Sequence, residues 1–214
     1  MSLERHLPLT TTLPLVKATL LLAAVCALLA LALGIPFAGE HAPSAFDTAA
    51  ANAIHLSPGL LDVLVLPTEP YVLLPALALA VFWCLRKSRH ADAARVVAGP
   101  AIAVVLNAWV LKPLYDRWKN DTLVYPSGHT VSMVATLTVL VLLTRKLIAL
   151  VIADVLLLAA AIGLVGLGYH YLTDVIGGAL FGAAVALLTW SVPRRAPEPS
   201  AGLPPADTSS GSPR

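Results

Sequence analysis

Six long apolar stretches alternate with short polar stretches along the chain. A helix of about 20 apolar residues crosses the roughly 30 Å hydrocarbon core of a bilayer. The predicted spans cover residues 18–37, 70–85, 96–111, 128–144, 147–169 and 175–190. The pattern therefore predicts an all-α, polytopic membrane protein with six transmembrane helices.

Two further stretches do not fit a span. Residues 56–67 are apolar but too short to cross a bilayer, which favours an interfacial or re-entrant piece. Residues 196–214 are rich in Pro, Ser and Gly and carry too little apolar surface to offset the entropy of ordering. We therefore expect one membrane domain, residues 1–195, followed by a disordered tail at 196–214.

Basic residues are distributed unequally between the two sides of the predicted bundle. With six spans, one side holds both termini and Arg86, Lys87, Arg89, Arg95, Arg145, Lys146, Arg194 and Arg195. The long linker on the opposite side, residues 38–69, has no Lys or Arg. Cytoplasmic loops carry the excess of basic residues. We therefore expect a plasma-membrane protein with both termini in the cytoplasm.

Composition excludes some classes of function. Hydrophobic residues make up 58% of the chain and charged residues 12%, against about 25% charged residues in a soluble domain. A net charge of +2, without a basic face, argues against a nucleic-acid partner. Cys26 and Cys84 lie inside apolar runs, where packing is their expected role. No H-E-x-x-H pair occurs, so a zinc hydrolase ranks low. We expect no cofactor and no metal.

Cations gather on the outer side, where short loops normally avoid them. Lys112, Arg117 and Lys119 precede residues 126–128, Pro-Ser-Gly, which open an apolar helix. The free amide groups and positive dipole end of such a helix bind anions. An arginine fork can bind two phosphate oxygens at once. The stretch 112–129 therefore predicts a phosphate site that faces outward.

Two histidines and one aspartate bring acid–base chemistry to the same side. His129 stands at the start of the fourth span, and His170 and Asp174 stand at the junction of the last two. With a spacing of four on one helix face, the carboxylate can orient the imidazole. An oriented imidazole is a nucleophile, and a second imidazole can protonate a leaving group. These residues predict metal-free phosphoryl transfer through a phosphohistidine.

These residues resemble the type 2 phosphatidic acid phosphatase superfamily, which also contains the vanadium haloperoxidases. Its motifs are K-x6-R-P, P-S-G-H and S-R-x5-H-x3-D. The second is present in full at residues 126–129, and the latter half of the third is His170 and Asp174. The resemblance covers about residues 96–190, which it implies are the catalytic core, and it implies the fold of that superfamily. It further implies His170 as nucleophile, Asp174 as its orienting partner and His129 as general acid. It also implies that Lys112, Ser127 and the Gly128 amide hold the phosphate.

Both arginines of these motifs are replaced. Lys119 and Asn120 stand where the first motif has Arg-Pro, and Gly163 and Leu164 stand where the third has Ser-Arg. Arg117 lies in the same loop as Lys119. We therefore expect Arg117 and Lys119 to supply the missing phosphate contacts.

Several functions remain open at this point. The resemblance favours a lipid phosphate or diphosphate phosphatase acting on undecaprenyl diphosphate, phosphatidic acid or phosphatidylglycerol phosphate. A lipid phosphotransferase is a second possibility within enzymes. A catalytically impaired relative acting as a transporter or scaffold is the alternative from another class. The missing arginines favour that alternative, as does Asp154, a carboxylate inside the fifth predicted span.

Overall fold

The computed structural model describes residues 9–192, and their side chains from residue 16 onward. The predicted tail at 196–214 and the basic pair Arg194 and Arg195 lie outside the described residues. Within them, almost every element is a helix, so the predicted all-α class is confirmed.

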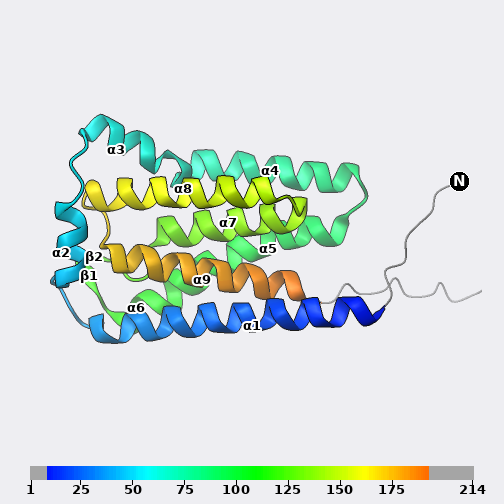
Figure 1. Ribbon diagram of the computed structural model, residues 1–214, viewed down its shortest axis with the longest axis horizontal. Coiled ribbons are helices and arrows are strands. Elements are labelled where there is room, and N and C mark those ends of the chain that lie inside the picture. The colour runs from blue at the N-terminus through cyan, green and yellow to red at the C-terminus, as the bar shows by residue number, and fades with distance from the viewer. Residues whose placement is uncertain (1–8, 193–214) are drawn as a thin grey trace, which may run out of the picture.

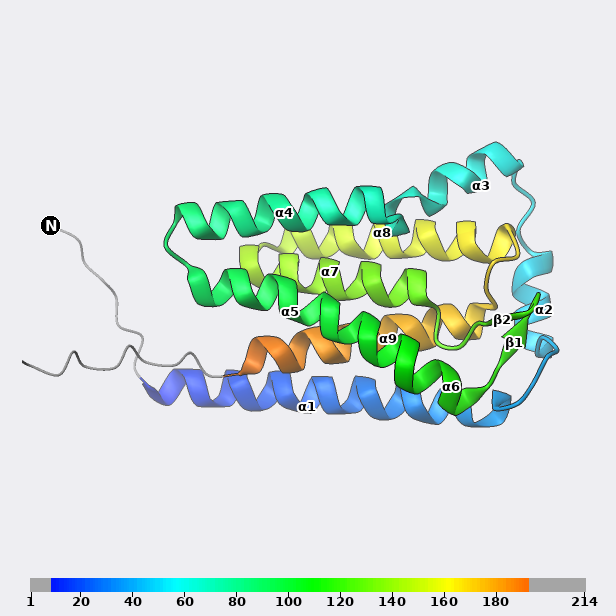
Figure 2. The same ribbon diagram turned by 180° about the vertical axis from the view of Figure 1, so that it is seen from behind.

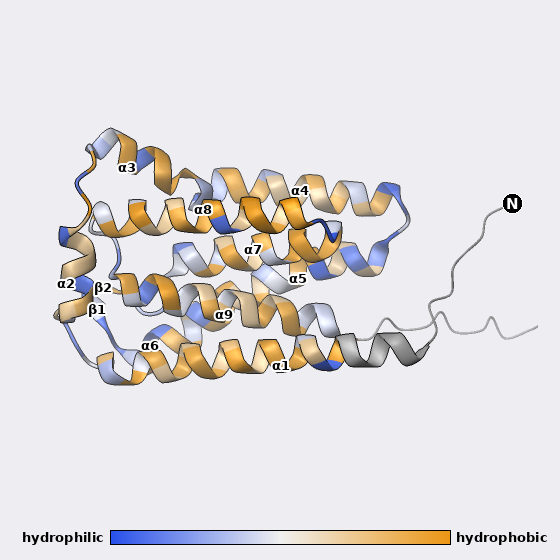
Figure 3. Ribbon diagram, in the orientation of Figure 1, coloured by the Kyte–Doolittle hydropathy of each residue, from blue (hydrophilic) through white to orange (hydrophobic). Residues whose placement is uncertain are grey.

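Six helices run lengthwise side by side (Figures 1 and 2). They are α1 (Leu9–Gly34), α4 (Pro70–Arg86), α5 (His90–Leu106), α7 (Gly128–Thr144), α8 (Leu147–Gly166) and α9 (Leu172–Ser191). In the described part of the chain, five segments are long and apolar enough to cross a membrane, and α7 is a shorter apolar helix of 17 residues. Their outer faces are mostly apolar (Figure 3). The six predicted spans therefore correspond to these six helices.

Helices α7 and α9 pack closely at the centre of the bundle. A Cβ atom added to Gly178 would lie 2.8 Å from the carbonyl oxygen of Ser127, and one added to Gly182 would lie 2.7 Å from that of Val131. Small residues let two membrane helices bring their backbones into contact in this way. The start of α7 is therefore fixed against the first turns of α9.

The short elements gather at one end of the bundle (Figure 1). They are the 3-10 turns Ile35–Phe37 and Leu66–Thr68, α2 (Ala45–Asn52), α3 (Pro58–Val65), and the hairpin of β1 (Trp118–Lys119) and β2 (Thr122–Leu123). The apolar piece at 56–67 forms α3, which lies against the end of α8. A Cβ atom added to Gly163 would lie 2.7 Å from Val65 Cγ2.

The chain between α5 and α7 is tied down on α1. Residues Asn107–Leu111 form a π-helical turn, and α6 (Lys112–Tyr115) follows and ends at Asp116 with φ 48°. The Tyr115 hydroxyl donates to the Leu31 carbonyl oxygen at 2.6 Å, and the Tyr125 hydroxyl donates to that of Ala30. These contacts hold the polar stretch 112–129 at the end of the bundle that carries the short elements.

Candidate active site

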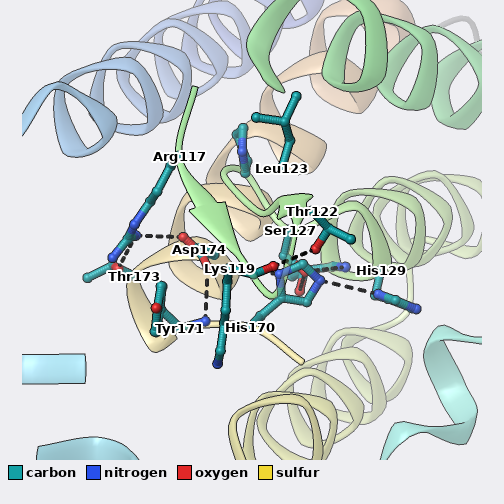
Figure 4. Close-up of polar contacts among 12 residues, drawn as sticks. Arg117, Lys119, Thr122, Leu123, Ser127, His129, His170, Tyr171, Thr173 and Asp174 are labelled. Carbon is teal, nitrogen blue, oxygen red and sulfur yellow. Dashed lines mark hydrogen bonds and ion pairs between the residues drawn. The ribbon is translucent and has the colours of Figure 1, made fainter. Parts of the chain in front are cut away.

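The two predicted histidines face each other. His129 Nδ1 lies 3.3 Å from His170 Nε2, and the two rings meet edge to face (Figure 4). His129 is the second residue of α7, whereas His170 lies in the turn between α8 and α9. The backbone N–H of His170 donates to the Leu164 carbonyl oxygen at 3.3 Å, which fixes this turn to the end of α8.

Asp174 lies behind His170, but the two do not share a helix face as expected. Helix α9 begins only at Leu172, because the Asp174 carboxylate accepts a hydrogen bond from the Tyr171 backbone N–H at 2.9 Å and caps the helix start. Asp174 Oδ2 lies 3.9 Å from His170 Nδ1, and this buried nitrogen has no hydrogen-bond partner within the described chain. At this distance the two groups are close neighbours but do not form a hydrogen bond.

The placement of Arg117 differs from the prediction of a phosphate-binding fork. Its side chain is fully buried, and Nη1 donates to Asp174 Oδ1 at 2.6 Å and to Thr173 Oγ1 at 2.7 Å. Nη2 donates to Asp47 Oδ2 at 3.0 Å. Figure 4 shows the guanidinium turned toward Asp174 and away from His129. The two carboxylates hold the guanidinium inside the protein, so it does not extend into the loop to meet a ligand. Arg117 therefore braces Asp174.

Ser127 and Gly128 stand at the start of α7 as predicted. Ser127 is the N-cap, and its Oγ accepts from the Thr130 N–H at 3.4 Å. Ser127 is fully buried, and its own N–H donates to the Asp174 carbonyl oxygen at 3.0 Å. Gly128 lies on the surface of the cavity beside His129. The first turn of α7 therefore offers Gly128, rather than the Ser127 side chain, to a ligand.

Two lysines supply positive charge next to the histidines. The Lys112 ammonium donates to the Leu123 carbonyl oxygen, and Lys119 Nζ lies 4.3 Å from the centre of the Tyr171 ring. Both line the same cavity as His129 and His170. Burial lowers the pKa of Lys119 from its ordinary value, although the carboxylates of Asp174 and Asp47 oppose that shift.

The two residues that replace Ser-Arg of the third motif serve packing. Gly163 lets α3 approach α8, and the side chain of Leu164 is fully buried with Val65 and Val175. An arginine at 164 would place its charge inside this apolar cluster. In the site itself, the contribution of Leu164 is its carbonyl oxygen, which accepts the hydrogen bonds that hold the turn carrying His170.

A cavity of about 1330 Å³ joins the polar groups to apolar helix faces. Its polar end is lined by Lys112, Lys119, Asn120, Thr122, Gly128, His129 and His170. It then continues along α4 and α5, for example past Leu77 and Val104. This shape suits a molecule with an anionic head and long apolar chains.

Sequence reasoning missed three polar residues that the fold brings to the site. Asp47 and Thr173 complete the contacts of Arg117, and Asn107, which is 2% exposed, lines the cavity. The sequence signal for Asp47 was Ser44-x-x-Asp47, a capping box before an apolar helix. Among the described residues, no group of three His, Cys, Asp or Glu side chains is arranged to hold a metal ion.

Comparison with known proteins found a matching family model and a similar solved structure. Residues 108–198 match the family model of the PAP2 superfamily. A crystal structure of a transmembrane PAP2-type phosphatidylglycerolphosphate phosphatase from Bacillus subtilis is similar, with a TM-score of 0.64 and 24% identity over 78% of this chain and 94% of that one. A search of curated protein sequences found no significant match.

The apolar helices and the membrane fold of this neighbour establish a multi-pass membrane protein. The matched residues contain P-S-G-H, His170 and Asp174, which are the positions that carried the predicted resemblance. The resemblance of this chain to the PAP2 superfamily is thereby confirmed.

Proposed function

We propose that this chain is an integral-membrane lipid phosphatase that hydrolyses its substrate through a phosphohistidine on His170. The observation that carries the proposal is the pair His129 and His170, at 3.3 Å, standing at the polar end of an apolar cavity. Phosphatidylglycerol phosphate is the substrate in the name of the similar B. subtilis protein. Phosphatidic acid and undecaprenyl diphosphate have the same combination of a phosphate head and apolar chains.

The cations and the start of α7 bind the phosphate first. Lys112, Lys119 and the Gly128 amide supply charge and hydrogen-bond donors, while the lipid chains occupy the cavity between α4 and α5. Because only 3.3 Å separates the two imidazoles, the His129 ring must swing away before a phosphoryl group fits between them. Among these donors, the Gly128 amide is fixed by the backbone of α7, and a preorganised donor is worth about 10²- to 10³-fold in rate.

The reaction then proceeds in two displacements. The Nε2 lone pair of His170 attacks phosphorus, the bond from phosphorus to the bridging oxygen breaks, and that oxygen takes a proton from His129. Water next attacks the phosphohistidine, His129 takes a proton from this water, and the N–P bond breaks to release inorganic phosphate. General acid–base help of this kind contributes about 10²- to 10⁴-fold. Asp174 stabilises the charge that develops on His170 in the first step.

The proposal includes an orientation of the chain in the membrane, which is supported by the positions of the basic residues. The basic residues of the turns after α4 and α7 lie at the end opposite to the histidines. By the positive-inside rule, both termini are cytoplasmic and the site faces the outside of the plasma membrane. The phosphatase therefore acts on lipid heads in the outer leaflet.

Phosphate release by the purified, detergent-solubilised protein in EDTA tests the function. The panel contains phosphatidic acid, phosphatidylglycerol phosphate, undecaprenyl diphosphate and glycerol 3-phosphate, the last as a substrate without chains. His170→Ala should abolish release, and His55→Ala, at an exposed histidine on the linker before α3, should not. Release from glycerol 3-phosphate alone would contradict a lipid substrate. No release by a folded wild type would favour transport or scaffolding.

A further inference from the structure

Asp47 is a buried carboxylate that lies far from the site residues in the sequence but is brought next to them by the fold. It lies on α2, 2% exposed, and pairs with Ser44 in a capping box. Its Oδ1 accepts hydrogen bonds from the Thr173 N–H and the Thr173 hydroxyl, each at 2.9 Å. Thr173 is in the first turn of α9, where N–H groups lack helical partners. Asp47 therefore caps α9 from another helix.

The charge of Asp47 is maintained in spite of its burial. Burial alone raises the pKa of Asp47, but the hydrogen bonds from Thr173 and Ser44 outweigh it, and the net shift is downward. Asp47, Arg117 and Asp174 thus bring two carboxylates to one guanidinium, with every side chain fully buried. The cluster carries a net negative charge directly behind His170.

The division of hydrogen bonds within this cluster is what matters for the histidine. Asp47 accepts from Nη2 of Arg117, Nη1 donates to Oδ1 of Asp174, and Nε has no hydrogen-bond partner within the described chain. Asp174 Oδ2 makes no bond to the guanidinium; it accepts from the Tyr171 N–H at 2.9 Å and lies 3.9 Å from His170 Nδ1. Without Asp47, Nη2 would be released to compete with the Tyr171 N–H for Asp174 Oδ2, since bidentate pairing is the preferred arginine–carboxylate geometry.

We propose that Asp47 is a positioning residue for phosphoryl transfer: by holding one arm of Arg117, it keeps Asp174 Oδ2 aimed at His170. The proposal rests on the proposed function, in which His170 is the nucleophile. Asp47 touches neither substrate nor reacting atoms. Its main effect is therefore on the chemical step, because it makes no hydrogen bond to the groups that hold the phosphate, Lys112, Lys119 and the start of α7.

Asp47→Asn tests this role, with Asp62→Asn, the same change at an exposed position on α3, as the control. We expect kcat of Asp47→Asn to fall roughly 10- to 100-fold, the range for groups that orient a reactive partner, with KM changed less than about twofold because the groups that bind phosphate stay in place. Vanadate inhibition should weaken by the same factor as kcat, since vanadate bonds to the nucleophile. Wild-type kcat in Asp47→Asn, with only a lower Tm, would overturn the proposal.

A second pair of variants separates positioning from folding. In an Arg117→Ala background, which is expected to be inactive, Asp47→Asn is read by Tm. If Asp47 acts through Arg117, Tm rises because one uncompensated buried carboxylate is neutralised. A further fall in Tm would mean that Asp47 acts independently and would overturn the proposal. This comparison of Tm does not need turnover. A wild type that releases no phosphate would refute the proposed function, whereas an active wild type with an equally active Asp47→Asn variant would refute the role of Asp47 alone.

Discussion

The two sides of the candidate site are built in different ways. Behind His170, Asp47, Arg117 and Asp174 are fully buried and joined by hydrogen bonds from three separate elements. On the phosphate side, Lys112 and Lys119 are half-buried point charges on flexible stems, one tied to a carbonyl oxygen and one lying over a ring. The arginine of this site therefore pairs with the carboxylate behind His170, while the two lysines line the cavity in which we propose that the phosphate binds.

Arg117→Ala gives the largest expected effect, because it breaks the rigid side. Removing one partner of a buried ion pair costs about 3–5 kcal/mol, since the other charges remain uncompensated. We expect phosphate release to be abolished as completely as in His170→Ala, together with a fall in Tm that His170→Ala does not cause. Arg86→Ala, at an exposed arginine, is the control. Near-normal turnover in Arg117→Ala would contradict the bracing role.

Gly178→Val should displace the start of α7, which carries His129, relative to His170. The new side chain would meet the Ser127 carbonyl oxygen, since even a Cβ lies 2.8 Å from it, and would push the start of α7 and His129 away from His170. A displacement of about 1 Å can cost 10²-fold in rate. We expect a loss of that order in kcat. Gly59→Val, where nothing lies within 4 Å of the added Cβ, should leave kcat unchanged; equal losses would argue against this alignment.

Ala101→Trp distinguishes binding of the lipid chains in the apolar part of the cavity from binding of the phosphate head at its polar end. Ala101 lines the apolar part of the cavity on α5, so a large ring there should obstruct the lipid chains and leave the polar end intact. We expect KM for phosphatidic acid to rise about tenfold, a loss of about 1.4 kcal/mol in binding, with hydrolysis of a soluble aryl phosphate unchanged. Ala94→Trp, exposed on the same helix, is the control. Equal losses on both substrates would show that the chains do not bind here.

Lys119→Arg should give the smallest effect and should appear as a pH dependence. Burial lowers the pKa of Lys119, so this side chain loses its positive charge at a lower pH than an ordinary lysine. Phosphate binding should therefore weaken, and KM should rise, as pH increases into the alkaline range. Arginine keeps its charge there, so the variant should show a flatter KM with a few-fold gain at high pH. Parallel KM curves for both proteins would exclude Lys119 as a phosphate ligand.

Much of the helical framework could be predicted because the length of an apolar run is a local property. The ends of the last spans could not, since they depend on polar groups that the fold brings together. Helix α8 ends at Gly166 rather than at 169, because Gly168 has φ 73° and the Tyr169 N–H donates to the Leu164 carbonyl oxygen. Helix α9 begins at Leu172 rather than at 175, because Asp47 and Asp174 cap it.

In the site, too, residues within short motifs could be predicted, and contacts between distant residues could not. His129, His170 and Asp174 could be found because each motif is short and contiguous, so its spacing survives in the sequence. The role of Arg117 could not be found, because its second partner, Asp47, lies 70 residues earlier and is brought to it only when α2 packs against α9. The sequence shows that Arg117 can pair with an anion, but which anion it contacts depends on the packing of α2 against α9.

The measurement that tests the central claim most directly is the capture of the phosphoenzyme. His129→Ala is mixed with p-nitrophenyl phosphate, whose leaving group needs no general acid, and the reaction is quenched in alkali, where phosphohistidine is stable. Peptide mass spectrometry should then find phosphate on His170, and none should be found when His170→Ala is treated in the same way. Continued turnover with no phosphate on His170, or with phosphate on another residue, would contradict the account.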